Sequence, residues 1–426
     1  MHSDQKFAFL RSAIALAAVA FAIVGFTQTG QAQSFTVIHS FNGPEGAFPE
    51  AGLTIDAAGA IYGTTSEGGG VNGNVFKLTY STRNGWTLAS LYLFTGAPDG
   101  YEPWGRVSFG PDGSMYGPTY LGGNGLCHNN WMIGCGTVYQ LTRSQSSATR
   151  WNEGIVYSFA GRSDGEYPQQ SDVFVDQSGN VYGTTTAGGF WGIPTCRNGC
   201  GTVYKLSPSG GGWTETVVYS FHSGEGQFPS GGVAPDEYGN LYGVTLQGGQ
   251  YGLGAVYELS PSGSGWTIQT LYSFTGGADG LFPMGSLIFD SSGNLFGTAS
   301  TGGSGNNGTV FELTHTSSSW AFQTLYDIQG SNVVASGPRG DLAIDTAGNL
   351  YGTTNGGGAH ARGSVFKLSP SSHGWTYTTL YDFNAQSDGG WPTSGVVLDS
   401  AGNLYGMTTY GGTVNCYCGV IYEITP

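Results

Sequence analysis

Aromatic residues that fall outside an otherwise regular pattern are the first candidates for chemistry in this sequence. Flat aromatic rings stack on apolar ligand faces, and polar neighbours fix the orientation of the ligand. Such residues gather in a few loop-like segments and predict a binding patch. The alternative is that they pack these longer loops onto the fold. The residues concerned are Trp104, Trp131, Trp191, Tyr101, Phe190, His128, His222 and Arg197.

Acidic residues form a second group because they recur in one short motif, acid-Gly-x-aromatic-Pro. One interpretation is an acidic ring that attracts a cation or a basic ligand. The other is a turn made by the acid and glycine, with the aromatic residue and proline wedged between structural units. Near-identical recurrence favours the second, since an asymmetric ligand rarely needs many equal sites. The acidic residues are Glu45, Asp99, Asp164, Glu225, Asp279 and Asp388.

The six cysteines occur as three close pairs: Cys127 with Cys135, Cys196 with Cys200, and Cys416 with Cys418. An even cysteine count in an exported chain indicates disulfides, and short local bridges limit loop entropy. We therefore expect three local disulfides. A bond between neighbouring units, of the Cys127–Cys196 type, is the alternative. No metal site and no cofactor are predicted, and no structural cation is indicated.

An enzyme is the rival to a binding protein. His222 or His128 with a nearby acidic residue would form a general acid–base pair, as a hydrolase or lyase needs. However, the histidines are spread along the chain, and no phosphate-binding loop or His-Glu-x-x-His motif is present. A purely structural repeat protein is the third possibility.

These residues sit on a repeat that occurs seven times. Its core is Gly-small-apolar-aromatic-Gly, as in Gly179–Gly183 and Gly239–Gly243. Each repeat has four strand-like segments rich in Val, Leu, Ile, Tyr, Phe and Thr, which we name A to D in chain order. An aspartate in each A–B turn, such as Asp176, is expected to bond its own turn backbone. Four strands at this period are typical of a β-propeller blade.

The termini predict how the ring closes. The chain ends after the seventh strand C, Gly419–Ile424, and the segment Ser34–Phe41 matches strand D. We therefore predict an all-β protein: a single seven-bladed β-propeller of four-stranded blades, spanning residues 33–426. Its N-terminal strand completes the last blade and removes an open sheet edge. The D–A and B–C loops then share the face at the channel mouth, where binding is expected.

Residues 1–32 have a basic start, an apolar run and small residues before position 33, which is the layout of a secretory signal peptide. We expect a secreted, periplasmic or cell-surface monomer with no membrane span after cleavage. Glycine is abundant, with 76 of 426 residues, and the net charge is −15. So acidic a chain is repelled by phosphate backbones, which excludes nucleic-acid binding.

The repeat resembles the bacterial GloVer tandem repeat, best at Gly179–Leu206 and Gly348–Leu368. The resemblance covers the whole chain after the leader and implies a secreted protein, but it supplies no catalytic residues. We therefore expect an extracellular binding module on the D–A/B–C face near the first three blades. Its expected partner is a carbohydrate or another surface polymer.

Overall fold

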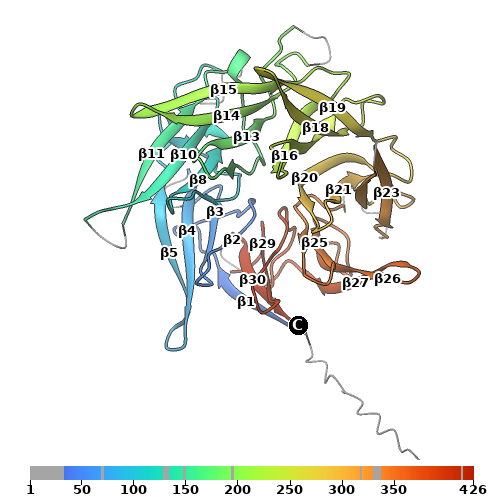
Figure 1. Cartoon of the computed structure of the whole chain (residues 1–426). Helices are drawn as coiled ribbons and strands as arrows, with labels where there is room; N and C mark the ends of the chain where they lie inside the picture. Colours follow the sequence, from blue (N-terminus) through green and yellow to red (C-terminus); the bar gives the residue numbers. More distant parts are fainter. Residues whose placement is uncertain are drawn as a thin grey trace, which may run out of the picture. The chain divides into compact units, whose positions relative to one another are not determined.

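The computed structural model describes residues 33–68, 72–127, 134–146, 150–192, 196–316, 319–329, 337–413 and 416–426. The predicted leader, residues 1–32, lies outside the described residues. Residues 33–426 form one compact unit of seven four-stranded antiparallel sheets (Figure 1). The predicted seven-bladed, all-β propeller is therefore confirmed. No helix among the described residues is long and apolar enough to span a membrane.

The first three blades follow the predicted A–D order. Blade one comprises β2 (Thr54–Ile55), β3 (Ile61–Thr65), β4 (Asn74–Ser81) and β5 (Gly85–Leu93). Blade two comprises β7 (Ser108–Phe109), β8 (Met115–Thr119), β10 (Thr137–Arg143) and β11 (Trp151–Ser158). Blade three comprises β12 (Phe174–Val175), β13 (Val181–Thr185), β14 (Thr202–Ser209) and β15 (Gly212–Ser220).

Blades four to six repeat the pattern, and strand A is longest in blades four and five. Blade four comprises β16 (Gln227–Pro235), β17 (Leu241–Gln247), β18 (Ala255–Ser262) and β19 (Gly265–Ser273). Blade five comprises β20 (Leu281–Phe289), β21 (Leu295–Thr301), β22 (Thr309–His315) and β23 (Trp320–Asp327). Blade six comprises β24 (Ala343–Ile344), β25 (Leu350–Thr354), β26 (Ser364–Ser371) and β27 (Gly374–Asp382).

Blade seven is completed by the N-terminal strand, as the termini predicted. Its strands are β28 (Val397–Leu398), β29 (Leu404–Thr408), β30 (Val420–Thr425) and, outermost, β1 (Ser34–Ser40). β1 pairs antiparallel with β30, with Ser34 opposite Thr425 and Ser40 opposite Val420. A short ribbon, β6 (Gly100–Tyr101) with β9 (Leu121–Gly122), and a 3-10 turn, η1 (Arg162–Asp164), lie in loops.

The core runs between neighbouring blades. In most blades a buried Phe follows strand D and meets an aromatic ring on strand C of the next blade. Phe94 and Tyr139 have ring centroids 5.1 Å apart, and Phe274 and Phe311 5.3 Å apart. Phe41 follows β1 and lies 5.4 Å from the Phe76 ring of blade one, so the same contact joins blade seven to blade one. Edge-to-face aromatic pairs at these distances stabilise the packing beyond their buried area.

A Gly–Pro contact joins each pair of neighbouring blades on the D–A/B–C face. The glycine before strand C packs so closely on the proline of the next D–A loop that an added Cβ would collide with the proline ring. An added Cβ would also meet a strand-B carbonyl, for example that of Thr65 at 2.4 Å from Gly73, and all seven glycines have positive φ, so packing and backbone conformation both favour glycine here. The pairs are Gly73–Pro103, Gly136–Pro168, Gly201–Pro229, Gly254–Pro283, Gly308–Pro338, Gly363–Pro392 and Gly419–Pro49.

Candidate functional site

One ring position near the channel axis differs in chemistry between blades. It stands two residues before strand A in five blades and lies within β16 and β20 in blades four and five. In every blade it precedes a buried apolar residue, such as Val107 or Leu342. The position is small in four blades, which lets the backbones approach one another at the channel axis. The other three blades carry charged side chains. In blade order the residues are Gly52, Arg106, Asp172, Gly232, Ser286, Asp341 and Gly395.

The three charged residues meet as one ionic cluster, although they come from blades two, three and six. The Nη2 of Arg106 lies 3.0 Å from Oδ2 of Asp172 and also contacts Oδ2 of Asp341. The backbone N–H of Arg106 donates to Oδ1 of Asp172 at 2.7 Å, and Asp341 accepts a hydrogen bond from the backbone N–H of Ser286. The Nε of Arg106 is buried and has no hydrogen-bond partner among the described residues.

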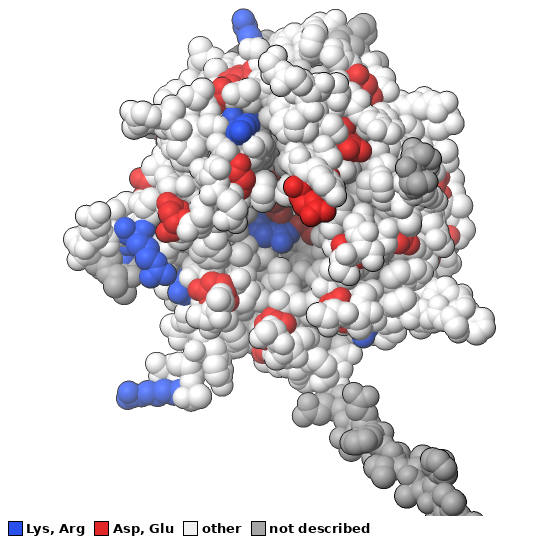
Figure 2. Space-filling view, viewed as in Figure 1, with Lys and Arg blue, Asp and Glu red and all other residues white. Residues whose placement is uncertain are grey.

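This cluster lies between two hollows on the channel axis. On one side is a channel of about 690 Å³, lined by strand A of several blades together with Arg106. On the other is a small mouth of about 40 Å³, lined by Glu50, Trp104, Arg339 and the two aspartates of the cluster. Figure 2 shows basic atoms in the hollow at the centre of one face, with acidic atoms beside them. The mouth holds a few water-sized groups rather than a whole ligand.

Trp104 is the aromatic residue of the mouth. Its ring stacks on Tyr120, with centroids 4.6 Å apart and planes 4° apart, and Tyr120 in turn contacts Tyr167 at 5.4 Å. Tyr101 packs in the same cluster. The indole of Trp104 is half-buried, and its buried Nε1 has no hydrogen-bond partner among the described residues. A donor left without a partner in a hollow is suited to an incoming acceptor.

Among the residues that line the mouth, Glu50 has the most strongly shifted pKa. Burial raises the pKa of Glu50 to about 7, and the nearby carboxylates of Glu102 and Glu67 add to the effect. Burial likewise raises the pKa of Glu102. Carboxyls that titrate near neutral pH in a hollow are found where proteins transfer protons. Among the described residues, however, no group of three or more His, Cys, Asp or Glu side chains is placed to hold a metal ion.

The D–A loops are held rigidly around this mouth. Six of them place a bulky residue before the proline in the left-handed region, for example Tyr167 at φ 58° and Phe228 at φ 57°. The N–H of each donates to the carbonyl just before strand C of the preceding blade. In three blades this carbonyl belongs to a cysteine: Cys135, Cys200 or Cys418. In these three blades the accepting carbonyl therefore lies in a B–C loop that carries a disulfide.

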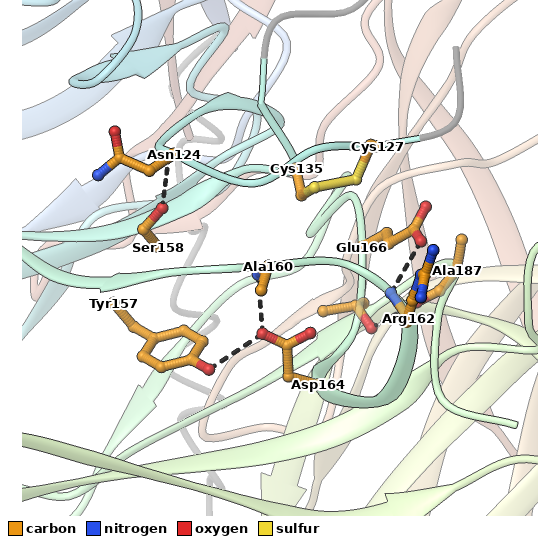
Figure 3. Close-up of a disulfide and its surroundings, with 11 residues drawn as sticks. Asn124, Cys127, Cys135, Tyr157, Ser158, Ala160, Arg162, Asp164, Glu166 and Ala187 are labelled. Carbon is orange, nitrogen blue, oxygen red and sulfur yellow. Dashed lines mark hydrogen bonds between the residues drawn. A yellow bond between two sulfur atoms is a disulfide. The ribbon is translucent and has the colours of Figure 1, made fainter.

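The predicted local disulfide pairs are present: Cys127–Cys135, Cys196–Cys200 and Cys416–Cys418. Figure 3 shows the first of them above the blade-three D–A loop. Each bridge closes a short stretch of a B–C loop. The bridges thereby restrict the segment that anchors the next D–A loop, and they do not join neighbouring blades.

The motif carboxylates are bonded inside their own loops. Asp164 accepts from Tyr157 Oη at 3.0 Å and from the N–H of Ala160 at 2.8 Å (Figure 3). Tyrosines donate in the same way to Asp99, Glu225, Asp279 and Asp388. In blade seven His39 replaces the tyrosine, and its Nε2 lies 3.0 Å from Glu45. A ligand-binding role for these carboxylates stays a prediction.

The structure separates the aromatic residues chosen from sequence. Trp104 lines the mouth and Tyr101 packs nearby, whereas Phe190 and His222 form another cluster, with ring centroids 4.2 Å apart. In that cluster His222 Nδ1 lies 3.4 Å from Glu225 Oε2. Trp191 is half-buried and Arg197 exposed, while His128 and Trp131 lie outside the described residues.

Sequence reasoning missed Glu50, Arg106, Asp172, Arg339 and Asp341. A signal for two of them was present, since aligning the repeats on the D–A proline places Arg106 and Asp341 where the other blades have Gly or Ser. In blade three this alignment gives Ser171 and not Asp172, because one extra residue lies between Pro168 and the buried Val173.

Comparison with known proteins agrees with the repeat pattern. The family model described as the Gloeobacter/Verrucomicrobia repeat matches residues 22–190, 125–335 and 269–426. The chain belongs to this repeat family. The resemblance to the GloVer repeat is therefore confirmed, and the repeat family accounts for the whole propeller. No curated protein matches the chain.

One solved structure shows that the repeat-family chain shares its fold with another propeller. A polysaccharide lyase of the ulvan lyase family PL25 is 11% identical, with a TM-score of 0.53, and the match covers 91% of this chain and 95% of that one. A gluconolactonase from Xanthomonas campestris is 13% identical, with a TM-score of 0.43, covering 76% and 87%. Identities this low show the fold alone.

Proposed function

We propose that this repeat propeller binds an extracellular carbohydrate across the mouth of its channel, on the D–A/B–C face. One observation carries the proposal: the charged residues that depart from the repeat at the inner ring, Arg106, Asp172 and Asp341, converge on the channel axis. The two aspartates line the mouth together with Trp104.

The chemistry of the mouth suits a hydroxyl-rich ligand. Arginine N–H groups donate and carboxylates accept, so Arg339 and Glu50 at the rim offer both kinds of partner to sugar hydroxyls. The indole of Trp104 offers a flat apolar surface for a sugar ring. Because the hollow measures only about 40 Å³, the chain of sugars lies over the mouth and inserts one small substituent.

The proposed function also includes export of the protein from the cytoplasm. The three local disulfides suit an oxidising compartment, and we assign residues 1–32 as the secretory leader on their sequence alone. The protein then meets polymers outside the cytoplasm, in the periplasm or at the cell surface.

The test is binding to an array of neutral and uronate-containing oligosaccharides. Trp104→Ala removes the stacking surface and is expected to weaken the best interaction about tenfold. Tyr238→Ala, a change at a residue 78% exposed in the A–B turn of blade four, is the control and leaves binding unchanged. No bound glycan, or equal loss in both variants, contradicts the proposal.

A second candidate is supported by Glu50. A carboxyl with a pKa near 7 at the mouth is suited to act as a general acid or base on a glycan held there. The solved propeller described as a polysaccharide lyase is a precedent for such chemistry on the fold. Cleavage of a bound oligosaccharide by the wild type, abolished in Glu50→Gln with binding retained, supports the enzyme. Binding without cleavage in the wild type refutes it.

A further inference from the structure

A second hollow lies on the opposite face, between the A–B turns of blades four and five and the C–D hairpin of blade five. It has a volume of about 670 Å³. Four carboxylates line it, and neither Lys nor Arg does. Tyr238, 78% exposed, and Trp320 are among its aromatic walls. The carboxylates are Asp236, Glu237, Glu258 and Asp290.

Three of the other six blades place a cation at the corresponding position. In blades one, three and six, a lysine on strand C lies directly across from the strand-B tyrosine. Its ammonium sits over the tyrosine ring, 5.1 to 5.4 Å from the centroid. The A–B aspartate accepts from the same tyrosine hydroxyl, for example Asp345 from Tyr351 at 2.9 Å. In these blades the tyrosine ring therefore forms a cation position, and the hydroxyl of that ring is bonded to the A–B aspartate.

Blade four keeps the ring and the carboxylate and loses the cation. Tyr242 donates to Asp236 at 3.2 Å, as in the other blades, but the residue across from it on strand C is Glu258. The Tyr242 ring also contacts Phe289 and Trp320, with centroids 5.3 and 5.7 Å away. Blade four thus has a negative charge where blades one, three and six carry a positive one. The corresponding residues of blades two, five and seven are Gln140, Glu312 and Glu423, and Glu423 accepts a hydrogen bond from the hydroxyl of Tyr405 at 2.8 Å.

We propose that this groove binds a lysine side chain of a partner protein, whose ammonium takes the place of the lysine that blades one, three and six supply themselves. The negative face of an aromatic ring attracts a cation, and carboxylates beside the ring add to the attraction. The groove is separate from the channel mouth, so this inference does not depend on the carbohydrate proposal.

The experiment titrates a tri-lysine peptide into the full chain and measures affinity by calorimetry. Glu258→Lys gives blade four the residue that three other blades carry, so it preserves the fold and fills the groove. We expect affinity to fall about tenfold or more. Glu312→Lys makes the same charge change at the equivalent position of blade five and should alter affinity less than about twofold.

Two further arms keep the inference falsifiable. A peptide with acetylated lysines, which lack the charge, should not bind. Glu258→Gln removes the charge without adding a longer side chain, and it should also weaken binding. Equal loss in Glu258→Lys and Glu312→Lys would show attraction by net charge alone and overturn the inference, as would absence of binding to the wild type.

Discussion

Replacing Phe41 by alanine tests whether the N-terminal strand is an integral part of blade seven. Phe41 is fully buried and packs on Phe76 of blade one and on His39. Deleting a buried Phe side chain costs about 3–5 kcal/mol in the free energy of unfolding. Phe274 is the matched control, since it holds the same repeat position, is also fully buried and packs on Phe311.

The assay is urea unfolding followed by tryptophan fluorescence, with the disulfides kept oxidised. In a closed ring, Phe41→Ala and Phe274→Ala lose similar stability, within about 1 kcal/mol of each other. If β1 did not join the ring, Phe41→Ala would behave as a surface change, within about 0.5 kcal/mol of the wild type. That result, together with a large loss in Phe274→Ala, would refute the closure.

Two further predictions concern packing between blades and pH. Gly254→Ala and Gly293→Ala both place alanine at positive φ, but only the Cβ at position 254 meets other atoms, in the Pro283 ring and the Thr245 carbonyl. Gly254→Ala should therefore lose about 1–3 kcal/mol more in urea unfolding, and equal losses would contradict the close packing at this position. Burial raises the pKa of Glu50 and of Glu215 to about 7. The folded chain therefore holds more protons than the unfolded chain between about pH 4.3 and 7, so stability falls as pH rises through this window. Melting temperatures across the window test this, and Glu50→Gln should flatten the decline; a wild-type melting temperature that is constant or rising would be inconsistent with it.

The fold could be predicted from sequence because every unit repeats the same local signals. Each repeat carries four short strands, an A–B aspartate and a D–A proline, and local turn chemistry sets these features. Asp176, for example, accepts from the backbone N–H groups of Ser178 and Asn180, as the turn pattern predicted. Closure of the ring was predicted because the last repeat lacks a strand D, whereas a segment that matches strand D precedes the first repeat.

The site could be predicted only in part, because its residues come together through tertiary structure. Arg106 and Asp341 are far apart in the sequence, and nothing local indicates that blades two and six face each other across the axis. Trp104 was selected because it lies outside the repeat positions of tryptophan. Arg106 was missed because a single charged residue in a loop ordinarily indicates a solvated surface.

Hydrogen–deuterium exchange on the complex with the best-binding oligosaccharide tests the proposed mouth most directly. We expect slower exchange in the segments that line the mouth, residues 50–52, 102–106, 170–172, 339–341 and 393–395. Slower exchange confined to the opposite face, or to Phe190 and Trp191, would contradict a carbohydrate site at the channel mouth.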